Sequence, residues 1–102
     1  METALLGIAL PHVFKNVKEM LIRQGFLVQT MPTANPVIVA YYQGNWYRRA
    51  KQIILELSSL EKEITRVDIT AIINGNKNTR EAEEVVEEAF AAALHEKFKY
   101  NP

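Results

Sequence analysis

The segment Thr65–Ile73 alternates its side chains with a period of two, and this pattern constrains the fold more than any other in the chain. In an extended segment Val67, Ile69 and Ala71 point to one side, whereas Arg66 points to the other. A strand with one apolar side has to be covered on that side by a second layer of structure. We therefore predict a β-sheet that is covered by helices.

An amphipathic helix is predicted after this strand. Apolar residues recur at steps of three and four from Ala82 to Leu94, Asn78 is a suitable N-cap, and Glu81 completes a capping box. The opposite side of this helix carries five glutamates, which are Glu81, Glu83, Glu84, Glu87 and Glu88. We interpret them as a solvated face near the end of the helix dipole that favours negative charge.

The N-terminal half predicts a helix and a hairpin. A helix is expected over residues 11–24, because Pro11 suits the first turn and Gly25 suits the C-terminal cap. Phe26–Thr30 and Pro36–Tyr42 are rich in β-branched and aromatic residues, which predicts two antiparallel strands.

Two segments have competing interpretations. Apolar residues at steps of three and four predict a helix from Trp46 to Glu61, and the alternative is a long strand of a β-meander over Tyr47–Leu57. Residues 1–9 are compatible with a short helix, an extra edge strand or a flexible lead.

These elements predict one α+β domain over residues 1–102, which is an ordinary domain size. The expected order is α-β-β-α-β-α, in a two-layer sandwich with a small mixed sheet of three strands, or four if the N-terminus adds one. The passage from Tyr42 to Thr65 is then a right-handed crossover. If all helices cover one face, the other face exposes tyrosine and isoleucine side chains and needs a partner.

Composition excludes several classes of chemistry. The absence of cysteine removes disulfides, thiolate nucleophiles and thiolate metal ligands. A net charge of zero gives no long-range field for a polyanion, and it permits self-association. No stretch approaches the ~18 apolar residues of a membrane span, and Ala4–Leu10 lacks the flanks of a signal peptide. We expect a cytoplasmic protein without membrane contact.

No catalytic or metal-binding pattern is complete. His12 and His95 have no second ligand at helical spacing, so no metal site or cofactor is predicted. Asp68 lies on a strand beside Arg66 and Thr70, which suggests either a cross-strand charge pair or the acid of a small enzyme.

The densest functional cluster is aromatic and basic. Within residues 41–51 the candidate binding residues are Tyr41, Tyr42, Trp46, Tyr47, Arg48 and Arg49. Aromatic residues and arginine anchor protein interfaces, and they also stack on bases and pair with phosphates. Core packing of some of these rings is the third interpretation.

The segment Gly75–Ala82, which precedes an alanine-rich helix, resembles the end of a double-stranded-RNA-binding domain over about twenty residues. The resemblance implies a helix, three strands and a helix, with RNA as ligand. The chain departs from that family where glutamates follow the helix start, which is basic in the family, so we do not assign it to the family.

We therefore predict a non-enzymatic interaction or assembly module that associates with itself as a homodimer or with another protein. A nucleic-acid-binding domain that uses residues 41–51 and a small enzyme centred on Asp68 are the alternatives.

Overall fold

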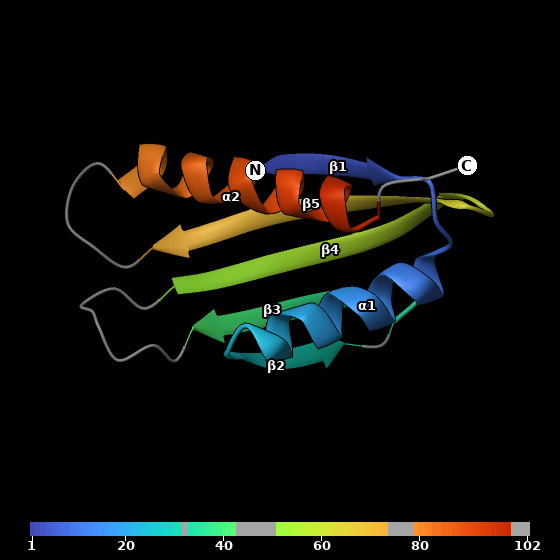
Figure 1. Cartoon of the computed structure of the whole chain (residues 1–102), viewed down its shortest axis with the longest axis horizontal. Coiled ribbons are helices and arrows are strands. Elements are labelled where there is room, and N and C mark those ends of the chain that lie inside the picture. Colours follow the sequence, from blue (N-terminus) through green and yellow to red (C-terminus); the bar gives the residue numbers. More distant parts are fainter. Residues whose placement is uncertain (32, 43–50, 74–78, 99–102) are drawn as a thin grey trace.

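The computed structural model of the chain describes residues 1–31, 33–42, 51–73 and 79–98, without the side chains of Tyr42, Lys51 and Thr79. Its elements follow the order β-α-β-β-β-β-α (Figure 1). They are β1 (Glu2–Leu6), α1 (Leu10–Arg23), β2 (Phe26–Met31), β3 (Val37–Tyr42), β4 (Lys51–Glu61), β5 (Ile64–Ile73) and α2 (Thr79–Lys97).

The strands form one five-stranded sheet in the order β1-β5-β4-β3-β2, and all neighbours are antiparallel. Strands β2 to β5 form a meander, and β1 joins it beside β5. Both helices lie against the same face of the sheet (Figure 1), with α2 over β1 and β5, and α1 in contact mainly with β2 and also with β4 and β5. The sheet therefore has a helix-covered face and an open face.

The core lies between the helices and the covered face. Alternate residues of the central strands are fully buried there, including Ile38, Leu55, Leu57, Val67 and Ile69. The helices contribute Val13, Val17, Leu21, Phe90 and Leu94. The buried hydroxyl of Thr65 donates to the backbone oxygen of Ile8 at 2.7 Å, which ties the β1–α1 connection to β5.

The predicted helix from Trp46 to Glu61 is wrong, because residues 51–61 form strand β4. Residues 46–50 lie outside the described part of the chain. Ile53, Leu55 and Leu57 are buried on the covered face, while Ile54 and Glu56 point to the open face. Because Ile54 is apolar although it lies on the open face, apolar and polar residues do not alternate there, and the sequence does not show the two-residue period of a strand. The alternative of a long strand in a β-meander fits the structure.

This correction changes the order and the sheet. The expected order α-β-β-α-β-α gives way to β-α-β-β-β-β-α, and the small mixed sheet is a five-stranded antiparallel one. No right-handed crossover links Tyr42 to Thr65, because β4 pairs with both β3 and β5. Residues 2–6 are an edge strand, one of the three interpretations left open.

The α+β class and the other elements are confirmed. Helix α1 covers residues 10–23, and Gly25 follows it with φ of 91°, a left-handed conformation that glycine adopts without a steric penalty. Strands β2 and β3 pair as the expected antiparallel hairpin. Strand β5 buries Val67 and Ile69 as its alternation predicts. The Asn78 N-cap lies outside the described residues.

The strand assignment of β4 makes a stability prediction. Leu55→Ala should lower the free energy of unfolding by about 2–5 kcal/mol, because the side chain is fully buried against the helices. Ile54→Ala should cost less, because Ile54 lies half-buried on the open face. Chemical denaturation of both variants measures the difference. A larger loss at position 54 than at position 55 would contradict the observed register.

Candidate functional site: the open sheet face

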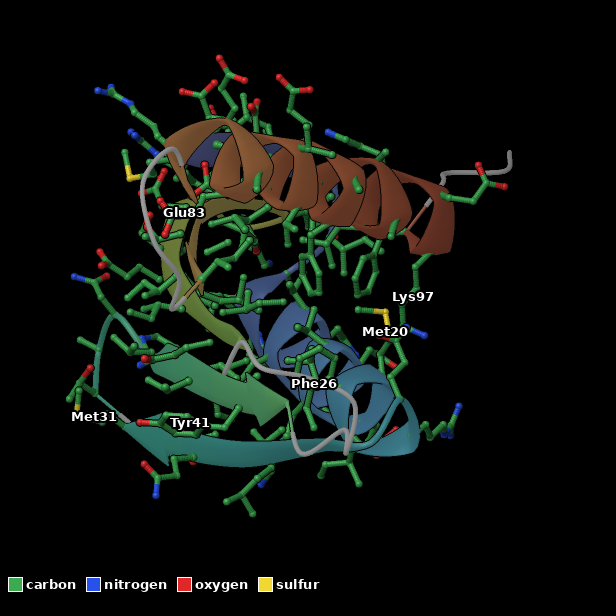
Figure 2. All side chains as sticks on the ribbon, turned by 90° about the vertical axis from the view of Figure 1, so that its left-hand side faces the viewer. Met20, Phe26, Met31, Tyr41, Glu83 and Lys97 are labelled. Carbon is green, nitrogen blue, oxygen red and sulfur yellow. The ribbon has the colours of Figure 1, made fainter. Side chains whose placement is uncertain are left out.

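The open face has a mainly apolar half and a more polar half, although the polar half also carries Leu5, which is 55% exposed on β1. The apolar half, called the open-face patch, consists of Leu27, Met31, Val37, Val39, Tyr41, Ile54 and Ile72. Figure 2 shows Met31 and Tyr41 on the left of the molecule, away from Met20 and Phe26 on the helix side. Among the described residues, no helix lies over this face.

Cross-strand pairing joins most of the open-face patch, and the uncharged polar residues Gln29 and Gln52 lie among its members. Leu27 lies opposite Tyr41, and Met31 lies opposite Val37, between β2 and β3. Val39 in turn lies opposite Ile54 on β4. Such directly opposed side chains contact each other on one face of a sheet. Leu27 is 49% exposed, Met31 55% and Tyr41 37%, so the patch is most open on β2 and β3.

The polar half lies toward β1. Asp68 accepts a hydrogen bond of 2.7 Å from the Thr3 hydroxyl and one of 3.1 Å from Nε of Arg66. Glu56 lies opposite Asp68 on β4. Arg66 is thus paired with Asp68 on the open face. Asp68 lines none of the described cavities, so the structure adds no substrate site to the enzyme alternative.

Of the candidate binding residues, the structure places Tyr41 in the open-face patch. Tyr42 ends β3, and its side chain is not described. Trp46, Tyr47, Arg48 and Arg49 lie outside the described residues. Tyr41 is thus the one candidate whose side chain is described on the open face, and its role in binding stays a prediction. The sequence did not single out Leu27 or Met31.

Two glutamates of α2 depart from the predicted solvated face. Glu81, Glu84 and Glu88 are exposed as expected, whereas Glu87 is only 4% exposed. Its Oε2 accepts the backbone N–H of Ala71 at 2.8 Å. Glu83, one turn earlier, accepts the N–H of Ile73 at 3.0 Å.

These carboxylates replace a missing strand partner. Strand β1 pairs with residues 65–69 of β5, so the next N–H groups along this edge have no strand beside them. Residues two apart on a strand are about 6.7 Å apart, and residues four apart on a helix rise about 6 Å. The spacing of Glu83 and Glu87 therefore matches that of Ile73 and Ala71. A buried N–H without an acceptor would be costly, which explains the buried carboxylate.

The same carboxylate holds the amino terminus. The Met1 amine lies 2.9 Å from Oε1 of Glu87. Its pKa is raised above the ordinary 8.0, first by the hydrogen bond to Glu87 and then by the negative charges of Glu87, Glu84 and Glu2, while partial desolvation opposes the shift. One carboxylate oxygen of Glu87 is thus bonded to the Ala71 N–H and the other to the Met1 amine, so this side chain has a structural role.

The remaining chemistry on the described surface is sparse. His12 and His95 are both exposed, and no group of three metal-ligating side chains occurs among the described residues. A groove of about 300 Å³ lies between α1 and α2, lined by apolar side chains including Met20, Val85 and Phe90. Neither described helix combines the length and apolar character needed to span a membrane.

Comparison of the chain with models of protein families, with curated proteins and with solved structures finds no match. The helix–three-strand–helix order implied by the RNA-binding resemblance also differs from the structure, which has four strands between its helices and a further strand before them.

Removal of the Glu87 carboxylate should destabilise the fold. We expect Glu87→Ala to lower the free energy of unfolding by about 1–3 kcal/mol, because the N–H of Ala71 loses a charged acceptor. Glu88→Ala is the matched control on the exposed side of α2 and should change it by less than about 0.5 kcal/mol. Equal effects at the two positions would show that Glu87 does not cap β5.

The amine of Met1 predicts a loss of stability at alkaline pH. A group whose pKa is raised in the folded state contributes its stabilisation below its unfolded pKa of about 8 and loses it as the pH rises through the folded value. Thermal unfolding across this range should therefore show a falling Tm for the chain with a free Met1 amine. Glu87→Gln, which keeps an acceptor oxygen but removes the charge, should flatten the decline. An unchanged slope in this variant would contradict the assignment.

Proposed function

We propose that the chain is a non-enzymatic interaction module that self-associates through the β2–β3 end of its open sheet face. The observation that carries this proposal is the open-face patch, in which exposed Leu27 lies opposite Tyr41 and exposed Met31 lies opposite Val37 on two neighbouring strands. Contiguous exposed apolar surface on a folded domain marks an interaction site more often than it serves stability.

The distribution of charge supports a second copy of the chain as the partner. The open-face patch contains no charged residue. Arg66 and Asp68 lie on β5, and Glu56 on β4 borders the patch opposite Val37. The chain as a whole has twelve cationic and twelve acidic residues, so two copies approach without net repulsion. Burial of apolar surface then supplies the driving force.

The charges of the open face also disfavour nucleic acid as the ligand of this surface. Arg66 is the only cation among the described side chains of the open face, and it is paired with Asp68. A surface that binds nucleic acid requires several unpaired cations to displace counterions. Arg48 and Arg49 lie outside the described residues, so the nucleic-acid alternative for residues 41–51 stays a prediction.

Charged substitutions at the β2 end of the open-face patch should dissociate the assembly. We expect the wild-type chain to be a dimer by light scattering or sedimentation, and the double variant Leu27→Asp, Met31→Asp to be a monomer, because it places carboxylates in an apolar contact. Val85→Asp is the control, since Val85 is 65% exposed but lies on α2. It should stay dimeric. A wild-type chain that remains monomeric up to millimolar concentration would refute the proposed function.

A further inference from the structure

The outer edge of β2 lacks the features that keep sheet edges from pairing. Strand β2 lies at the end of the sheet, and within the described part of the chain Leu27–Met31 pair with no strand other than β3. Its six residues, Phe26–Met31, read FLVQTM and include no charge, proline or glycine. Natural proteins protect edge strands with charged side chains, prolines, bulges or short length, because an unprotected edge pairs with another strand.

The opposite side of the sheet is treated differently. Strand β1 is five residues long and begins with a glutamate. Beyond it, the free N–H groups of β5 at Ala71 and Ile73 are occupied by the carboxylates of Glu87 and Glu83. Two N–H groups of β5 beyond β1 are thus occupied by side chains of the same chain, while β2 keeps an uncharged edge.

We propose that two copies of the chain pair antiparallel through the β2 edge about a two-fold axis, so that their sheets join into one of ten strands. The inference rests on the proposed function, because it specifies how the chain self-associates. Residues that lie directly opposite each other in a sheet point to the same face. A two-fold axis midway between two residues of β2 would pair neighbouring residues, which point to opposite faces, so the axis must pass beside a single residue. Within the strand, Val28 and Gln29 are the two central choices.

The side chains select the register centred on Gln29. It places Leu27 opposite the partner's Met31 and Gln29 opposite the partner's Gln29 on the open face. The two most exposed apolar residues of β2, 49% and 55% exposed, then cover each other. A register centred on Val28 would instead set Leu27 against the partner's glutamine and leave Met31 beyond the pairing.

Edge pairing also leaves the polar half of the open face in water. Stacking of two sheets face to face would bury Glu56, Arg66 and Asp68, and desolvation of charged groups opposes such burial. Edge pairing buries none of these charges. It joins the open-face patches of the two copies across the axis, and Tyr41 lies one strand away on each side.

A single introduced cysteine tests this geometry. The chain has no cysteine, so Gln29→Cys carries one thiol. On the axis, the two Cα atoms would lie about 4.5–5.5 Å apart, within the range of a disulfide. We expect mild oxidation to convert most of this variant into a covalent dimer. Ser59→Cys, exposed at the β4–β5 hairpin, is the control and should remain largely uncrosslinked.

Two outcomes separate the inference from the proposed function. In the first outcome, the wild-type chain is a dimer, Gln29→Cys crosslinks no faster than Ser59→Cys, and Ile54→Asp dissociates the dimer. Self-association then stands, and edge pairing is overturned in favour of face stacking. If no dimer forms at any concentration, both are overturned. Edge pairing predicts that Ile54→Asp, one strand inside β3, leaves the dimer intact.

Charge reversal on the axis provides a second test that does not depend on oxidation. A residue on a two-fold axis faces the same residue of the partner. Gln29→Lys and Gln29→Glu should therefore each place two like charges opposite each other and raise the Kd of the homodimer by up to about fivefold. An equimolar mixture of the two variants should form a heterodimer at least as tight as the wild-type dimer. A mixture that dimerises no better than either variant alone would overturn the register centred on Gln29.

Discussion

The fold depends on the burial of one sheet face beneath two helices. Helices α1 and α2 both cross the same side of the five strands, and the fully buried side chains, such as Leu21, Leu55 and Leu94, lie between the two layers. Two helices suffice to exclude water from one face of a sheet of this size, and the described chain has no third helix for the other face. The apolar residues of the open face therefore lie outside the core that the two described helices cover, and this position supports the proposal that they serve association.

This arrangement explains which elements could be predicted from the sequence. In β5, apolar residues alternate with Arg66 and Asp68, and in α1 they follow the helical period, so each pattern reports a single buried side. In β4, Ile54 lies on the open face between buried neighbours, and the resulting pair with Ile53 imitates the i, i+1, i+4 spacing of a helix. Local periodicity fails at this point because the open face of the sheet is itself partly apolar.

The candidate site was only partly predictable for a related reason. Tyr41 was identified because aromatic residues are common at interfaces, whereas Leu27 and Met31 become a site only through their register opposite β3 and their place at the end of the sheet. The burial of Glu87 could not be predicted from the sequence for the same reason. Its neighbours along α2 are solvated glutamates, and its burial follows from the point at which β1 stops pairing with β5. Both facts are nonlocal, and no pattern within one segment contains them.

The two sides of the sheet place opposite demands on the chain. Beside β1, an unpaired stretch of β5 is occupied at the cost of burying a carboxylate, which is favourable only because that carboxylate accepts a backbone N–H and pairs with an amine. A single lysine in β2 would protect the other edge at far smaller cost, yet residues 26–31 contain none. An edge that is so easily protected and yet carries no charge supports the proposal that β2 pairs with a second copy. That proposal also accounts for the exposure of Leu27 and Met31, because the same pairing brings their side chains together.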